Sequence, residues 1–246
     1  MFTNFKFWVK YYLNIDSLGK GIASKIIFLM MVMIRVIPNF LPSEYTDFSK
    51  VQDWMTTVLY AEEITEDMMI IPLSRANYLF LLIASAVLFI CGMIAVFYCG
   101  LAVRHFRNLE NKPNLKLSSF WGRFIILCIV MLIIAMPFAF TAVYLFLLFL
   151  LALPFMVTII PCYLSGDEGL WRSFTGIIKR TKGRYLLILR DLTGVYLVYL
   201  IISFLINAVS LVSMTAFAVL NCACDSWFLL VAARFCAIQY TMTKKI

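Results

Sequence analysis

The uncharged stretch Phe124–Leu164 constrains the fold more than any other feature of this sequence. Its 41 residues contain no Asp, Glu, Lys or Arg. An unbroken α-helix of this length would measure roughly 60 Å, about twice the thickness of the hydrocarbon core of a bilayer. We therefore expect the stretch to reverse near Met136–Thr141, where Pro137 cannot donate a helical hydrogen bond, and to form two membrane spans.

The two ends of this predicted hairpin continue into basic segments, which orient it in the membrane. Arg104–Arg123 precedes the hairpin and Arg172–Arg190 follows it. Short loops rich in Lys and Arg are retained in the cytoplasm, so both ends should lie on the cytoplasmic side.

The overall composition also indicates a membrane protein. The chain is 63% hydrophobic and 14% charged, with a mean hydropathy of +0.94, which is too apolar for a soluble core of 246 residues. The formal net charge of +8 raises the possibility of nucleic-acid binding. However, the basic residues border apolar segments, as membrane orientation requires, so we expect no nucleic-acid partner.

These patterns predict an all-α, polytopic membrane protein with about six transmembrane helices in a single domain, residues 1–246. Both termini should be cytoplasmic. An external acidic loop is expected at 42–75, because it contains seven of the thirteen acidic residues. The approximate regions of the spans are 22–40, 77–103, 124–140, 142–164, 186–219 and 227–243.

Three amphipathic segments are expected to lie in the membrane interface. In residues 1–21, Phe5, Trp8, Tyr12 and Ile15 recur at helical spacing. The second segment, Pro113–Arg123, has an apolar face opposite Lys116 and Arg123. The third segment follows the hairpin and begins at Ser165. We expect the second and third segments, one on each side of the hairpin, to form cytoplasmic elbow helices.

The second elbow has a clear start signal in the sequence. Ser165-Gly166-Asp167-Glu168 has the spacing of a capping box, which predicts a helix beginning at Ser165. The elbows also indicate three repeated hairpin units, 1–103, 104–164 and 165–246. Gly122-Arg123-Phe124 and Gly183-Arg184-Tyr185 are their clearest matching points.

Residue types that bind metals are sparse or poorly spaced. His105 is the single histidine and, between two arginines, is expected to contact headgroups rather than transfer protons. Cys222 and Cys224 fall in the expected external turn Leu220–Ser226, but their spacing does not match a zinc motif. The acidic group Glu62–Asp67 could gather calcium, although a solvated acidic face is the favoured interpretation. We expect neither a metal nor a cofactor.

Polar residues within the predicted spans are candidates for function. Arg35 lies in the first span, and Asn207 in the fifth is expected to bond to a neighbouring helix. Arg190 and Asp191, near the inner end of the fifth span, are expected either to neutralise each other or to extend toward the membrane surface. Arg234 in the last span either lies near mid-depth or extends toward the cytoplasmic surface, and we favour the second alternative.

The C-terminal part resembles a known bacterial family. Leu153-Pro154 through Pro161, Gly169-Leu170-Trp171-Arg172-Ser173-Phe174, Lys182-Gly183-Arg184-Tyr185 and Tyr240 before a basic tail are similar to the membrane domain of some glycerophosphodiester phosphodiesterases and their YciC-like relatives. The resemblance covers about residues 101–246. It implies a helical inner-membrane protein, and it transfers no catalytic residue because the phosphodiesterase barrel is missing from this sequence.

The function that we expect is non-catalytic, because the sequence offers no nucleophile motif or metal-ligand cluster. A membrane scaffold or lipid-organising envelope protein is favoured. The alternative is a permease subunit of an ABC-type exporter that docks a separate ATPase through its elbow helices; a homo-oligomer is also open. The expected contacts with anionic headgroups or a partner are Lys116, Arg123, Arg172, Lys179, Arg180, Lys182 and Arg184.

Overall fold

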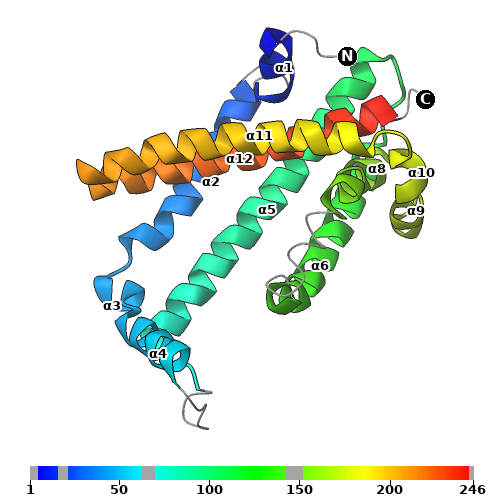
Figure 1. Cartoon of the computed structure of the whole chain (residues 1–246). Coiled ribbons are helices and arrows are strands. Elements are labelled where there is room, and N and C mark those ends of the chain that lie inside the picture. Colours follow the sequence, from blue (N-terminus) through cyan, green and yellow to red (C-terminus); the bar gives the residue numbers. More distant parts are fainter. Residues whose placement is uncertain (1–4, 16–21, 62–69, 142–151, 244–246) are drawn as a thin grey trace.

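The computed structural model describes residues 5–15, 22–61, 70–141 and 152–243, and every regular element within these ranges is a helix. Five helical segments are long and apolar enough to cross a membrane, which confirms the prediction of a helical membrane protein (Figure 1). These segments are Ile22–Phe40, Arg75–Leu109, Leu117–Ile134, Tyr185–Leu211 and Met214–Met242. The expected span 142–164 falls partly outside the described residues, and Ala152–Ser165 is a shorter apolar helix.

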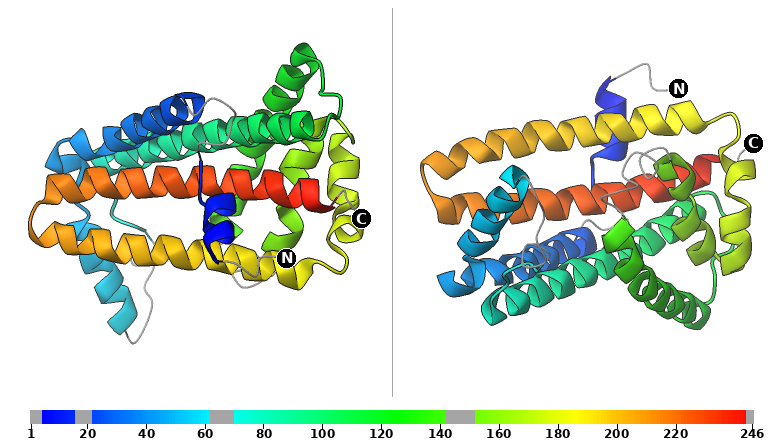
Figure 2. Two further views of the ribbon diagram at one scale, coloured as in Figure 1. Left: turned by 90° about the horizontal axis from the view of Figure 1, so that it is seen from above. Right: turned by 60° about the horizontal axis from the view of Figure 1, so that its bottom comes forward.

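Helix α12 (Met214–Thr243) is the centre of the bundle. It packs against α2 (Ile22–Val36), α5 (Arg75–Leu109) and α11 (Tyr185–Asn207). Figure 2 shows α11 and α12 side by side, and Figure 1 shows that α2 and α5 cross them obliquely. The short 3-10 helix η3 (Ala208–Leu211) ends the α11 segment just before α12 begins. The buried core between α2, α5 and α12 contains Met31, Cys91, Tyr98, Leu230 and Tyr240.

The start of α12 corrects the predicted external turn. Residues Leu220–Ser226 lie within the helix, and Cys222 and Cys224 are buried free thiols rather than surface groups. Polar side chains made this segment resemble a turn, but they are satisfied inside the bundle. Ser226 Oγ donates to the Cys222 carbonyl oxygen at 2.7 Å, and Asp225 accepts bonds from two other helices.

The predicted reversal near Met136–Thr141 is also wrong. Helix α6 (Leu117–Thr141) continues through this segment, Pro137 included. Proline is tolerated within membrane helices when the surroundings satisfy the freed backbone groups. The predicted first elbow is therefore the N-terminal part of α6, and Phe120 within it is buried against α5 and α8 (Ile159–Ser165).

The capping box predicted at Ser165 does not form. Ser165 ends α8, because Gly166 takes a left-handed conformation with φ of +84°. Two short helices follow, α9 (Leu170–Thr175) and α10 (Ile177–Thr181), in place of one elbow helix. The predicted elbows thus differ in structure, and the three-unit repeat is not confirmed.

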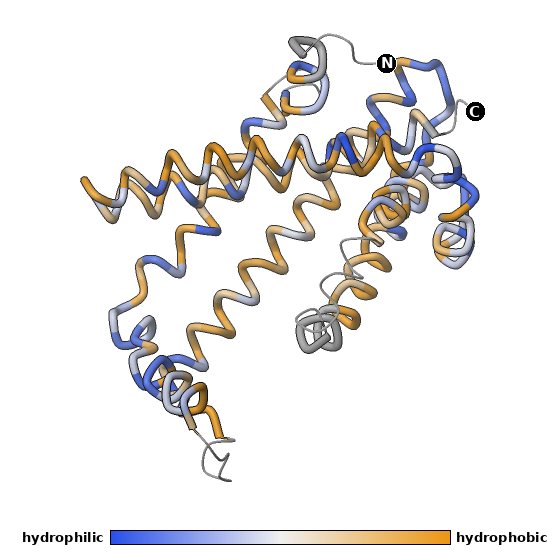
Figure 3. Tube along the Cα trace, in the orientation of Figure 1, coloured by the Kyte–Doolittle hydropathy of each residue, from blue (hydrophilic) through white to orange (hydrophobic). Residues whose placement is uncertain are grey.

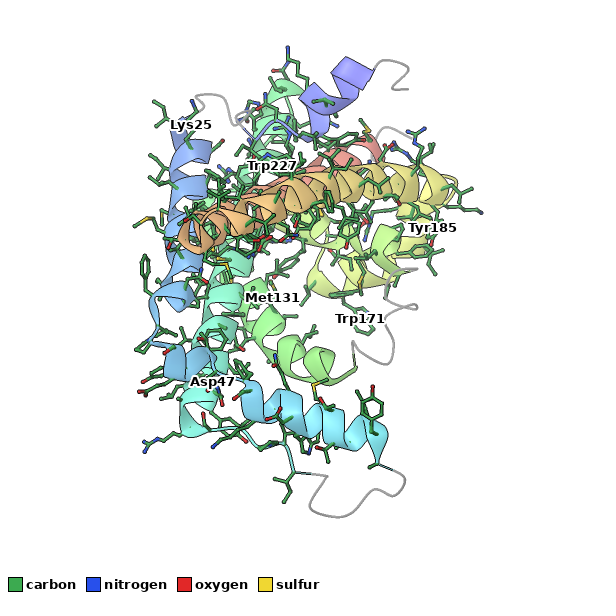
Figure 4. All side chains as sticks on the ribbon, turned by 60° about the vertical axis from the view of Figure 1, so that its left-hand side comes forward. Lys25, Asp47, Met131, Trp171, Tyr185 and Trp227 are labelled. Carbon is green, nitrogen blue, oxygen red and sulfur yellow. The ribbon has the colours of Figure 1, made fainter. Side chains whose placement is uncertain are left out.

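Polar residues gather at the two ends of the bundle, and apolar residues lie between them (Figure 3). At one end, α3 (Ser43–Thr46) and α4 (Ser49–Tyr60) cover the start of α5. Ser74 and Asn77 form a capping box there, and Asn77 Nδ2 also donates to the Tyr45 and Asp47 carbonyl oxygens. Lys25 and Asp47 lie near opposite ends of the α2 segment (Figure 4).

Candidate functional site

The first cluster of buried polar contacts connects the N-terminal segment, residues 5–15, to the C-terminal hairpin. This segment contains α1 (Phe5–Tyr12). The Tyr12 hydroxyl donates to Asp191 Oδ2 at 3.0 Å and accepts from Gln239 Nε2 at 3.0 Å. All three side chains are buried. The predicted position in the membrane interface is therefore wrong for Tyr12, which lies inside the protein. The structure does not describe the side chains of Phe5 and Trp8.

Backbone atoms of the N-terminal segment complete this cluster. Arg234 Nε on α12 donates to the Tyr11 carbonyl oxygen at 3.0 Å, and the Tyr98 hydroxyl on α5 donates to the Ile15 carbonyl oxygen at 2.8 Å. The Arg234 guanidinium lies 5.6 Å from the centre of the Phe106 ring. Arg234 is only 3% exposed, so the prediction that it extends toward the surface is wrong.

Burial keeps the Tyr12 phenol protonated. Desolvation is the largest cause that raises its pKa above the ordinary value, and the neighbouring Asp191 carboxylate raises it further. Arg184 opposes this shift. Asp191 Oδ1 also accepts from Arg190 Nη2 at 2.6 Å, which confirms the predicted mutual neutralisation of this pair.

A second cluster joins α5, α12 and the segment after α8. Asp167 accepts hydrogen bonds from Arg107 Nη1 at 2.9 Å, from Ser165 Oγ at 2.8 Å and from the Tyr240 hydroxyl. Arg107 Nη2 also donates to the Pro113 carbonyl oxygen at 2.6 Å. These contacts hold the loops at this end of the bundle together.

The third cluster lies in the other half of α12. Asp225 accepts from Arg35 Nη1 at 3.1 Å and from the Tyr199 hydroxyl at 2.8 Å. Arg35 was recognisable in the sequence as a cation within an apolar segment, whereas Asp225 lies in the segment that was expected to form an external turn. The signal that could have found Asp225 is the need of a cation within an apolar segment for an opposite charge.

The predicted headgroup contacts divide into two groups. Lys116, Arg172, Lys179 and Lys182 are exposed, and Arg184 is partly exposed. Arg180 instead forms an ion pair with Glu168, with Nη1 and Oε2 at 2.7 Å.

Arg123 and Asn207 also lie in positions different from those expected. Arg123 Nη1 donates to the Tyr163 and Glu168 carbonyl oxygens, both at 2.7 Å, and is therefore used within the protein. Asn207 is exposed at the C-terminal end of α11, so its predicted place in mid-membrane is wrong.

Within residues 5–15, 22–61, 70–141 and 152–243, no group of three or more His, Cys, Asp or Glu side chains is arranged to hold a metal ion. The acidic group Glu62–Asp67, considered above for calcium, lies entirely outside the described residues. Comparison of the chain with protein-family models, with curated proteins and with solved structures finds no match. The resemblance to YciC-like proteins stays a prediction.

Proposed function

We propose that this chain is a non-catalytic, multi-pass protein that organises anionic lipids as a scaffold in a bacterial plasma membrane. The observation that carries this proposal is the exposed basic surface at one end of an apolar helical bundle. The long helices expose large apolar side chains between their ends, as helices in contact with lipid do. On α11 these include Leu197, Ile201 and Phe204.

The basic surface comprises Lys116, Arg172, Lys179 and Lys182. These residues come from the start of α6 and from α9, α10 and the residue after α10. Each well-placed Lys or Arg near an anionic membrane contributes about 1 kcal/mol of attraction. In this proposal the basic end faces the cytoplasm together with both termini.

The test compares two matched pairs of substitutions in lipid nanodiscs of defined composition. Lys179→Gln with Lys182→Gln removes two charges from the basic surface, and Lys50→Gln with Arg75→Gln removes two from the opposite end. We expect the first pair to reduce retention of phosphatidylglycerol, measured by native mass spectrometry, by about 10- to 30-fold in affinity. Equal retention by both variants would contradict the lipid role.

One observation favours a permease subunit as the second candidate. Trp171 on α9 (Figure 4) and Ile178 on α10 are 79% and 73% exposed, and each directly precedes a basic residue in the sequence. Such side chains fit either lipid or the surface of a partner protein, here a separate ATPase. Purification in mild detergent with mass spectrometry separates the two roles. An ATPase that co-purifies with the wild-type protein in stoichiometric amount, but not with the double variant Trp171→Ala and Ile178→Ala, would favour the permease. A protein that co-purifies only with anionic lipid would favour the scaffold.

A further inference from the structure

Arg234 is a buried cation that has no anionic partner among the described residues. None of the five ion pairs formed among the described residues includes it. Its Nε donates to a backbone carbonyl oxygen, whereas its buried Nη1 has no hydrogen-bond partner in the part of the chain that the structure describes. A buried charge normally requires an opposite charge and filled hydrogen bonds, because desolvation is otherwise costly.

Among the described residues, the charged side chains near Tyr12 are already balanced against one another. Asp191 is the carboxylate that contacts the N-terminal segment, and Arg190 already pairs with it. Arg184 is close enough to Tyr12 to oppose the effect of Asp191 on the phenol. His105 lies near Arg234 on the α5 side. An anion placed here would therefore meet the Arg234 guanidinium as a positive charge with no carboxylate paired to it among the described residues.

The N-terminal segment occupies the position from which such an anion would reach Arg234. Two of its carbonyl oxygens accept bonds from Arg234 and Tyr98, and its Tyr12 hydroxyl accepts a bond from Gln239. These are neutral acceptors. Because hydrogen bonds to ionised acceptors are roughly twice as strong as neutral ones, an anion would compete well for the same donors.

We propose that Arg234, Tyr98 and Gln239 form a binding site for a phosphate-bearing anion, and that the N-terminal segment covers this site until the ligand displaces it. A guanidinium, a phenol and an amide, which all donate to the N-terminal segment, are donors that suit the several acceptor oxygens of a phosphate group. The phosphate can belong to a lipid headgroup or to a soluble ion. This proposal does not rest on the lipid-organising role, because it uses buried residues outside the exposed basic surface.

The first experiment measures amide hydrogen exchange of residues 9–15 in the full-length protein. One arm adds inorganic phosphate to protein in phosphatidylcholine nanodiscs, and the other uses nanodiscs that contain phosphatidic acid without free phosphate. Faster exchange in the first arm identifies a soluble ligand, and faster exchange confined to the second identifies a lipid headgroup. Unchanged exchange in both arms would overturn the proposal.

The second experiment measures the affinity for the active probe in three variants. Tyr12→Phe removes the hydroxyl that attaches the segment and should tighten binding about five- to tenfold, because displacement then breaks fewer hydrogen bonds. Arg234→Gln should weaken binding about 100-fold, and Arg234→Lys should restore part of it. Tyr60→Phe alters an exposed tyrosine on α4 and should leave affinity unchanged.

Two outcomes would count against the site. Equal affinity of Tyr12→Phe and the wild-type protein would show that the N-terminal segment does not compete with the ligand. Retention of full affinity by Arg234→Gln would remove the central residue of the site. Amide exchange in the core of α5 and α12, measured in the same samples, shows whether Arg234→Gln is folded. If it is misfolded, the affinities of Tyr12→Phe and Arg234→Lys decide whether the site exists.

Discussion

The Tyr12 hydroxyl donates a hydrogen bond to the Asp191 carboxylate at 3.0 Å, although 179 positions separate the two residues in the chain. Gln239 completes the arrangement by donating to the same hydroxyl. One side chain of the N-terminal segment thus contacts both helices of the C-terminal hairpin. The attachment of this segment depends on buried polar contacts as well as on apolar packing.

Substitution of Tyr12 by Phe should loosen the N-terminal segment while the bundle stays folded. The change keeps the ring and removes two hydrogen bonds, leaving the buried Gln239 amide unsatisfied. We expect a cost of about 1–3 kcal/mol in the free energy that holds the segment, measured as faster amide exchange of residues 9–15. Tyr60→Phe, at an exposed tyrosine, is the control. Equal exchange in the two variants would show that the hydroxyl contributes nothing to the attachment.

The attachment of the segment should survive alkaline pH. Burial and Asp191 raise the folded-state pKa of Tyr12, so its contribution is fully present below the unfolded-state value of about 10 and is lost only as the pH rises through the higher folded-state value. At pH 10 to 11 the Tyr12 phenol should therefore remain protonated. The ¹³Cζ resonance of labelled tyrosine, assigned by its loss in Tyr12→Phe, reports this directly. A phenolate shift near pH 10 would contradict the buried hydrogen bond.

The Arg35–Asp225 ion pair should be strongly coupled. Removal of either partner leaves a charge in an apolar environment, so Arg35→Gln and Asp225→Asn should each cost about 2–4 kcal/mol of unfolding free energy. The double variant should cost clearly less than the sum of the single variants. The free energies of unfolding of the two single variants and the double variant are measured in mixed micelles.

A more exposed ion pair provides the control for this cycle. Lys112 and Glu110 lie 2.7 Å apart in the loop after α5. Their coupling should be below about 1 kcal/mol, as is usual for exposed pairs. Additive losses at Arg35 and Asp225 would show that the two charges are stabilised independently of each other.

Gly100 allows the close approach of three helices. A Cβ atom at this position would lie 2.6 Å from Phe120 Cε2 and 3.3 Å from Leu164 Cδ1. Gly100→Ala should therefore force α6 and α8 away from α5, at a cost of about 1–3 kcal/mol. Gly122→Ala is the matched control, because a Cβ there meets nothing within 4 Å. It should be neutral or stabilising by up to about 1 kcal/mol. Equal melting temperatures for the two variants would contradict the packing.

Much of the architecture was predictable from local properties of the chain. Apolar runs place the spans near Ile22–Phe40 and Arg75–Leu109, because burial in a bilayer requires about 20 consecutive apolar residues wherever the segment lies in the fold. The acidic and basic ends were predictable for a similar reason, since charged residues are excluded from the apolar region. These features depend only on neighbours in the sequence.

Contacts between distant residues decided the rest. Asp225 resembled a turn residue until α2 placed Arg35 beside it, and Arg234 was expected near the surface until the N-terminal segment covered it. The reversal expected near Pro137 and the helix start expected at Ser165 also failed, because membrane helices tolerate proline and because Gly166, in a left-handed conformation, ends α8 at Ser165. A polar side chain within an apolar segment can face lipid, water or a partner, and its local sequence is the same in each case. Only tertiary packing, which supplies or withholds the partner, selects among these states.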